Sequence, residues 1–331
     1  MDVLPSLPVT SAQAGQTLAA VLRARLPGWS WTRVRALIDT RRVTVRGELC
    51  RDPARRLKEG DAVELLRRPL PPPPPPQSII IRHLDEHVVV VEKPAGISSV
   101  RHPAELAWRE ERKELTPTLH DLVRQQIAAP FGNGRRGEGV ASSASPRTSR
   151  DGSRLRIVHR LDKETSGLLV FARSVQAESA LGKQFHAHSV TRRYVAIVSG
   201  SPSAGTIRSN LVRDRGDGRR GSGEIGKEAI THVEIIERLG AFALVGCRLE
   251  TGRTHQIRIH LSENATPVCG DKVYHLGRDG REMPDHSGAT RLMLHAAELG
   301  FVHPVTRLPL HWEMPPPADF QATLDRLRGR A

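Results

Sequence analysis

Residues 157–174 read IVHRLDKETSGLLVFARS and place charged side chains directly before an uninterrupted apolar run. The apolar part, LLVFA at 168–172, has the length and composition of a buried strand. Ser166 and Gly167 predict a turn before this strand, and a glycine there lets the chain approach other backbone closely. We therefore expect His159–Glu164 on a loop at the edge of a sheet, where catalytic groups are often found.

Asp162 lies within this loop, flanked by Arg160 and Lys163. Their positive charges favour an ionised carboxylate, which can act as a nucleophile or as a base when it is held in position. From the spacing alone, an aspartate that only caps a turn explains the residue equally well.

A proline run, PLPPPPPP at 69–76, divides the chain. Consecutive prolines adopt the polyproline II conformation, which cannot continue a helix or a central strand. We expect a linker at 68–77 that spaces two domains, at 15–67 and 78–318, although such a run can also be a ligand for an aromatic groove. Residues 130–153 are rich in Gly, Ser and Arg, which predicts a flexible insertion in the second domain.

The first domain is expected to contain two amphipathic helices, with Ser30 capping the second. The face that they bury is formed by Leu18, Val21, Leu22, Leu26, Val34, Leu37 and Ile38. Four arginines of the second helix and the turn after it are expected to point outward: Arg33, Arg35, Arg41 and Arg42.

Two strands follow these helices, in RRVTVRGELC (41–50) and LKEGDAVEL (57–65). The whole unit resembles the S-four domain, a small α/β RNA-binding module first recognised in a small-subunit ribosomal protein. RRVTVRG stands in place of that module's usual Gly-Arg-Val-x-Val-Asn-Gly turn. The resemblance implies that the outward arginines contact RNA.

The composition also favours a nucleic-acid partner. Fifty Lys and Arg residues against 36 Asp and Glu give a formal net charge of +14, although a genome rich in G and C also enriches arginine codons. The three cysteines form no Cys-x-x-Cys pair, which argues against a zinc ribbon or a disulfide framework. The sequence has no export signal and no apolar run of membrane-spanning length, so we expect a cytoplasmic protein.

HRLDKETSG (159–167) resembles the His-Arg-Leu-Asp-x-x-Thr-Ser-Gly signature of the RluA-like pseudouridine synthases at every fixed position. Further segments resemble that family's motifs in the same order, over roughly residues 79–315. They are EKPAG (92–96), HSVTRRYVAIVSG (188–200), GKEAITHVEIIE (226–237), LETGRTHQIRIHL (249–261), GDKVYH (270–275) and LMLHAAELGFVHP (292–304). The resemblance implies an α+β fold with a mixed, mostly antiparallel sheet and a central cleft.

The resemblance also implies three catalytic residues. Asp162 matches the aspartate that acts on uridine while the glycosidic bond is cleaved, whether it adds to the ribose or the base or instead deprotonates the ribose. Tyr194 matches the tyrosine that stacks on the flipped uracil and is a candidate for the final proton transfer. Arg258 matches the arginine that pairs with the aspartate. Without the resemblance, Tyr194 reads as an ordinary strand residue, and Thr254 caps a helix with Ile257 and Leu261 inward and Arg258 in solvent.

Four further residues are expected to bind the substrate. Arg160 matches the residue that fills the space left by the flipped uridine, and Leu294 would wall the base pocket. His159 and Thr165 belong to the same signature. No metal is expected, because His186 and His188 lack a third ligand, and the isomerisation requires no cofactor.

We therefore expect an isomerase that converts uridine to pseudouridine in structured RNA, preferably large-subunit ribosomal RNA. Transfer RNA is the alternative substrate, and a catalytically inactive RNA-binding ribosome-assembly factor is the alternative function. A monomer suits an enzyme that docks on a large RNA. The stretches AELAWREERKEL (104–115) and 130–153 interrupt the family pattern and leave the choice of RNA open.

Overall fold

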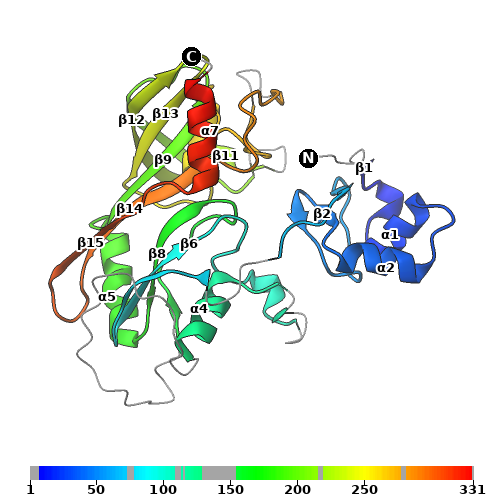
Figure 1. Cartoon of the computed structure of the whole chain (residues 1–331), viewed down its shortest axis with the longest axis horizontal. Helices are drawn as coiled ribbons and strands as arrows, with labels where there is room; N and C mark the ends of the chain where they lie inside the picture. The colour runs from blue at the N-terminus through cyan, green and yellow to red at the C-terminus, as the bar shows by residue number, and fades with distance from the viewer. Residues whose placement is uncertain are drawn as a thin grey trace. The chain divides into compact units, whose positions relative to one another are not determined.

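The structure of the protein is a computed structural model (Figure 1) that describes residues 7–72, 78–108, 113–114, 116–128, 154–214, 219–276 and 281–329. The chain divides into two compact units, Met1–Pro73 and Pro74–Ala331. Residues 73–77 of the expected linker lie outside the described residues, and so does the expected insertion at 130–153.

The first unit consists of two helices and a small antiparallel sheet. Its elements are β1 (Leu7–Pro8), a 3-10 turn (Ser11–Gln13), α1 (Leu18–Arg25), α2 (Trp31–Asp39), β2 (Val43–Val45), β3 (Glu48–Leu49) and β4 (Ala62–Leu65), and the strand order is β1-β4-β2-β3. The predicted cap of the second helix is confirmed, because Ser30 Oγ accepts a hydrogen bond from Arg33 N at 3.2 Å. The predicted apolar face is buried except for Leu26, which lies just beyond the end of α1 and is only partly buried.

Arg41 and Arg42 are held within this unit, rather than free on its surface as expected. Arg41 has a positive φ of 64° and turns back toward the end of the unit. Its Nε donates to the carbonyl oxygen of Leu70 at 3.0 Å and its Nη2 to that of Pro71 at 2.8 Å. Arg42 Nε donates to the carbonyl oxygen of Leu66 at 3.0 Å. The start of the expected linker is therefore bound to the first unit.

The second unit is built on an eleven-stranded mixed sheet. The strands are β5 (Ile81–Leu84), β6 (Val88–Lys93), β7 (Arg156–Ile157), β8 (Ser166–Ala172), β9 (Thr191–Ser199), β10 (Gly205–Val212), β11 (Gly221–Ser222), β12 (Lys227–Leu239), β13 (Phe242–Leu249), β14 (Leu294–Val302) and β15 (Pro309–Glu313). Their order is β11-β10-β12-β13-β9-β14-β8-β6-β5, with β15 paired to β14 and β7 to β8. Only the β14–β8 pair is parallel among the described ladders, which confirms the expected α+β class with a mostly antiparallel sheet.

Helices cover both faces of this sheet. They are α4 (Leu119–Ala128), α5 (Val175–His186), α6 (Gln256–Glu263) and α7 (Ala318–Arg328), with a 3-10 turn at Pro103–Glu105. Alternate residues of β6 and β8 face opposite sides, so α4 packs in one apolar cluster and α5 in the other. Figure 1 shows α7 beside β9, β12 and β13. Among the described helices, none is both long enough and apolar enough to cross a membrane.

The predicted buried strand after the signature is confirmed, because all seven residues of β8 are buried. The predicted turn at Ser166 and Gly167 is wrong, since both residues already belong to β8. Gly167 has a φ of 124° and pairs with Ala296 of β14. A Cβ atom added to Gly167 would overlap the backbone of Ala296, so the expected close approach of backbones occurs inside the sheet.

Candidate active site

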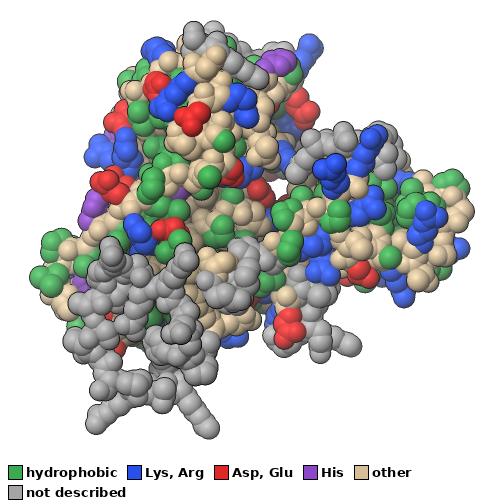
Figure 2. Space-filling model, in the orientation of Figure 1, with side chains coloured by type: hydrophobic (Ala, Val, Ile, Leu, Met, Phe, Trp, Pro, Cys, Tyr) green, Lys and Arg blue, Asp and Glu red, His purple; other side chains and the backbone are tan. Residues whose placement is uncertain are grey.

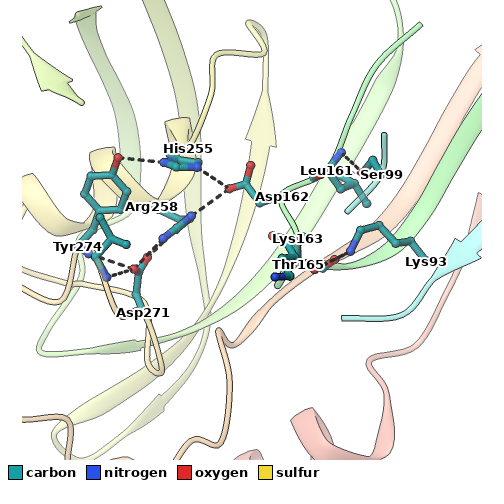
Figure 3. A network of polar contacts seen from close by, with 11 residues as sticks. Lys93, Ser99, Leu161, Asp162, Lys163, Thr165, His255, Arg258, Asp271 and Tyr274 are labelled. Carbon is teal, nitrogen blue, oxygen red and sulfur yellow. Dashed lines mark hydrogen bonds and ion pairs between the residues drawn. The ribbon is translucent and has the colours of Figure 1, made fainter. Parts of the chain in front are cut away.

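Asp162 lies on the loop that enters β8, and buried hydrogen bonds fix the backbone of this loop (Figure 3). Lys93, at the end of β6, is fully buried, and its Nζ donates to the carbonyl oxygens of Pro94 at 3.0 Å, Lys163 at 2.9 Å and Thr165 at 2.6 Å. Burial lowers the pKa of the Lys93 ammonium group to about 7. Three donated bonds require the charged form, because a neutral amine carries only two hydrogens.

A second contact holds the other side of the loop. Ser99 Oγ donates to the carbonyl oxygen of Leu161 at 2.7 Å and accepts from Leu161 N at 3.0 Å. Within the loop, Thr165 N donates to the carbonyl oxygen of Asp162 at 3.1 Å. The backbone on both sides of Asp162 is thus fixed by buried groups.

Arg258 joins Asp162 to a second carboxylate. It lies on α6 with 9% of its surface exposed, and its Nη1 is 3.3 Å from Asp162 Oδ2. Its Nε and Nη2 donate to Asp271 Oδ2 and Oδ1 at 2.6 and 2.8 Å. Burial alone would lower the pKa of Arg258, but the bonds and charge of Asp271 outweigh it and the pKa is raised. Asp271 therefore keeps the guanidinium charged and aimed at Asp162 (Figure 3).

Asp271 is itself firmly placed. Its side chain has no exposed surface, and Oδ1 also accepts from the backbone N–H groups of Val273 at 2.8 Å and Tyr274 at 3.0 Å. Burial would raise the pKa of this carboxyl group, but the contacts from Arg258 and the backbone lower it overall. An ionised, fully bonded carboxylate results, which can orient Arg258 without moving itself.

His255 is a second polar neighbour of Asp162. Its Nδ1 lies 2.9 Å from the Tyr274 hydroxyl and its Nε2 lies 3.9 Å from Asp162 Oδ2. Burial lowers the pKa of His255, which favours the neutral ring. The tautomer with its proton on Nε2 fits both neighbours, because Tyr274 can donate to Nδ1 while Nε2–H faces the carboxylate. Burial raises the pKa of Tyr274 to about 12, so its hydroxyl stays protonated.

The helix that carries Arg258 begins differently from the prediction. The N-cap of α6 is His255, with a φ of 60° and no side-chain cap bond, so the expected cap by Thr254 is wrong. Gln256 organises this turn instead, since its Oε1 accepts from Arg253 N at 2.9 Å and from Thr251 Oγ1 at 2.8 Å. The left-handed conformation of His255 is what places its ring beside Asp162 (Figure 3).

Tyr194 and Leu294 come from the neighbouring strands β9 and β14. Tyr194 is 8% exposed, and burial raises the pKa of its hydroxyl; the charge of Arg192 opposes this increase and that of Asp162 adds to it. In the β14–β9 ladder, Leu294 pairs with Ala196, two residues from Tyr194. Leu294 and Tyr194 therefore lie diagonally on the same face of the sheet, as parts of one apolar cluster.

The remaining residues of the signature differ in their surroundings. Arg160 is exposed. His159 faces the protein: its Nε2 accepts from Val170 N at 3.1 Å, its ring stacks on Phe185 at 4.6 Å, and burial lowers its pKa to about 3. Thr165 is 2% exposed, and its hydroxyl has no hydrogen-bond partner among the described residues. Substrate contacts by His159 and Thr165 stay a prediction.

In the first unit, Arg33 and Arg35 are exposed. The Arg33 guanidinium lies 3.9 Å from the centroid of the Trp29 ring, a cation–π contact that leaves its donors available. Cys50, Cys247 and Cys269 are free and buried. In the described ranges, no three His, Cys, Asp or Glu side chains gather as metal ligands would.

Several residues of the site have no role in the sequence analysis: Lys93, Ser99, His255, Asp271 and Tyr274. Four of them stand inside segments that were recognised as motifs, namely EKPAG, LETGRTHQIRIHL and GDKVYH. The motif matches were therefore the available signal, but only the folded geometry assigns these side chains to Asp162 and Arg258.

Comparison with known proteins identifies the family of the chain. The sequence profile of the family described as RNA pseudouridylate synthase matches residues 87–263. A protein of Zymomonas mobilis named ribosomal large subunit pseudouridine synthase D is 35% identical over 333 residues, which cover 95% of this chain and 94% of that protein. The chain belongs to the RNA pseudouridylate synthase family. It is thus an RNA pseudouridine synthase, an isomerase that forms pseudouridine from uridine.

A further relative and a solved structure are also named as pseudouridine synthases. An uncharacterized RNA pseudouridine synthase of Bacillus subtilis, YlyB, is 34% identical over 314 residues, covering 91% of this chain and 90% of that protein. The solved structure of human RNA pseudouridylate synthase domain containing 4 has a TM-score of 0.55 and 23% identity, and covers 75% of this chain and 93% of that chain. The similarity to this human structure shows a shared fold.

Proposed function

We propose that this pseudouridine synthase modifies specific uridines of large-subunit ribosomal RNA. Support comes from relatives of 35% and 34% identity that carry the name ribosomal large subunit pseudouridine synthase D and align over nearly the whole chain. The net charge of +14 suits a large polyanionic substrate. On the face shown in Figure 2, Lys and Arg side chains occur on both units.

Asp162 is the catalytic carboxylate in this proposal. The observation that carries it is the contact between Asp162 and Arg258 at 3.3 Å, with Arg258 itself locked by Asp271. An ionised carboxylate held by a buried arginine is positioned for nucleophilic or base chemistry at the uridine. Arg258 and His255 orient it through Oδ2, and the guanidinium of Arg258 balances its charge.

The isomerisation breaks the bond between N1 of uracil and C1′ of ribose and forms one between C5 and C1′. C5 loses its hydrogen and N1 gains one, so no external electron or group donor is needed. Tyr194 lies within electrostatic range of Asp162 and contributes an aromatic face that suits stacking on the base. Its protonated hydroxyl can relay the C5 proton by accepting it while releasing its own proton toward N1. Leu294 lies diagonally beside Tyr194 and walls the base pocket.

The target nucleotide has to leave its stack to reach Asp162. Arg160 is exposed two residues before Asp162, which suits a side chain that occupies the space left in the RNA. The first unit serves as an S-four-type RNA-binding domain, with Arg33 and Arg35 as exposed contacts and Arg41 and Arg42 mainly holding the end of the unit. The enzyme acts as a monomer.

The test is a map of pseudouridine across all cellular RNAs in cells that lack this gene. The cells are complemented with wild type, with Asp162→Ala, or with Asp325→Ala as a matched control on the surface of α7. We expect one or more large-subunit ribosomal sites to disappear and to return with wild type and the control only.

Each other outcome refutes a specific part of the proposal. Restoration by Asp162→Ala refutes the catalytic role of that carboxylate. A lost site in transfer RNA refutes the ribosomal substrate and leaves the chemistry intact. An unchanged map refutes the activity and favours a binding protein that assists ribosome assembly.

A further inference from the structure

A basic pocket of about 660 Å³ lies next to the start of α6. Four cations line it, from the end of β10, the loop that follows, the start of β12 and the turn before α6: Arg213, Arg220, Lys227 and Arg253. None of the described residues that line it is acidic. In the described contacts, none of these four side chains bonds to Asp162 or to Arg258.

Among the described residues, the cations of this pocket differ in their pairing from a neighbouring arginine. A neighbouring arginine of β10 is paired, because Arg208 Nη1 lies 3.0 Å from Glu228 Oε1. In contrast, no described carboxylate forms an ion pair with Arg213, Arg220 or Lys227. Unpaired cations that converge on one hollow favour an anionic ligand from outside the chain.

Arg253 adds directed donors to the pocket. Its Nε donates to the carbonyl oxygen of Glu228 at 2.9 Å, which fixes the side chain and leaves both terminal nitrogens as donors. The pocket also borders Gly252 and Thr254, directly before the N-terminus of α6, and the partial positive charge of a helix N-terminus adds to the attraction for an anion.

The pocket adjoins the active site. Thr254 lines it, and the next residue, His255, lies 3.9 Å from Asp162. Burial lowers the pKa of His255, and the positive charge of Arg220 adds to this lowering, so Arg220 lies within electrostatic range of the ring. An anion in the pocket would therefore sit beside a nucleotide whose base reaches Asp162.

We propose that this pocket binds a backbone phosphate of the RNA strand next to the target uridine. The inference rests on the proposed function, because it takes the strand that delivers the uridine as the ligand. A phosphodiester is an anion with two free oxygens, which suits the forked donors of arginine and the point charge of lysine. Such a contact sets the register of the strand, since phosphate contacts position an RNA while base contacts select its sequence.

The experiment measures the dissociation constant of a ribosomal RNA fragment that contains the modified uridine. The test variant is Arg213→Gln combined with Lys227→Gln, both exposed side chains, and the matched control is Lys183→Gln on the surface of α5. We expect the test variant to bind at least about 10-fold more weakly, with the slope of log K against log salt reduced by about 1, and the control to bind like wild type.

A second arm identifies the ligand as a backbone phosphate. Single neutral methylphosphonate linkages are introduced, one at a time, around the target uridine. For wild type, a methylphosphonate at one position is expected to weaken RNA binding about 10-fold. At that same position the substitution is expected to cause no further loss of affinity in the test variant. Equal affinity and salt slope for wild type and test variant would overturn the inference, as would a methylphosphonate penalty that is the same in both proteins.

The two proposals can fail separately. Binding is measured without turnover. If wild type binds the fragment but forms no pseudouridine, the proposed function is refuted, and the binding comparison between wild type and the test variant still tests the pocket. Conversely, normal turnover together with unchanged binding by the test variant refutes only the pocket. Thermal melting of both variants, expected within about 2 °C of wild type, shows that they are folded.

Discussion

The substitution Asp271→Asn tests whether Arg258 is held in place by a carboxylate that never touches the substrate. Within the described ranges, Oδ1 accepts three bonds, from Arg258 Nη2, Val273 N and Tyr274 N, and Oδ2 accepts one, from Arg258 Nε. An asparagine can keep its oxygen at the Oδ1 position. Its amide nitrogen would then face the Nε–H group of Arg258, so a donor meets a donor.

The magnitude follows from this geometry. Removing one partner of a buried ion pair costs about 3–5 kcal/mol, and we expect the lower end, about 3 kcal/mol of unfolding free energy, because Arg258 keeps Asp162 and one bond to the amide. The repelled guanidinium turns away from its present position. A displacement of about 1 Å near the reacting groups lowers the rate about 100-fold. The Michaelis constant should change little, since Asp271 is buried away from the RNA.

The assay is single-turnover release of tritium from uridine labelled at C5, since that hydrogen leaves when C5 joins the ribose. Leu324→Ala, which removes a buried side chain of α7, serves as the control with a comparable loss of stability. Arg258→Met alone should abolish turnover while the fold persists, because Asp162 loses its partner. A normal rate for Asp271→Asn refutes the reasoning, and so does a loss of rate no larger than that of Leu324→Ala.

Three other predictions concern the support of the site. Lys93→Met removes a buried donor from three backbone carbonyl groups, of which only that of Lys163 still accepts another described bond, from Gly96 N. We therefore expect a loss of about 3 kcal/mol in denaturant unfolding and a slower turnover; unchanged unfolding would show that the bonds are replaceable. The pKa of His159 is about 3 in the folded protein against 6.5 when unfolded, so the unfolded chain binds a proton first and stability falls as the pH drops from 6.5 toward 3. Melting temperatures across this range should fall more steeply for wild type than for His159→Gln, and parallel curves would assign the pH effect to other groups. Gly167→Ala forces a Cβ against the backbone of Ala296, so we expect a loss of more than about 3 kcal/mol or a failure to fold, and a melting temperature like that of wild type would contradict the close approach.

The features that the sequence predicts correctly rest on local signals. The apolar run of β8 is buried over its whole length, and the cap of α2 by Ser30 is present as expected. The class of the second unit also agrees, but the family resemblance implied that class and these local signals did not. Such signals extend over one element and do not depend on its partners.

The features that the sequence does not predict depend on contacts between distant segments. Arg258 and Asp162 are 96 positions apart, and the helical pattern around Arg258 by itself places that side chain in solvent. The misplaced cap at Thr254 and the turn assigned to Gly167 have the same origin, because each depends on another segment. Gln256, which organises the turn before α6, donates to the carbonyl oxygen of Ile230 of β12, and Gly167 pairs with Ala296 of β14. The family resemblance named Arg258 and Tyr194, but Asp271, His255 and Lys93 acquire their roles only through the folded contacts.

The position of β14 in the sheet has a consequence for biosynthesis. β14 separates β8 from β9, so the strand that joins them is made long after both. The loop with Asp162 enters β8, whereas Tyr194 is part of β9, and these two residues acquire their final spacing only when β14 is in place. During translation, the edges of β8 and β9 that later pair with β14 therefore stay unpaired until β14 has been made, and strands of other chains could pair with them. A growing chain cannot modify the RNA of the ribosome that is making it until residue 302 has left the exit tunnel.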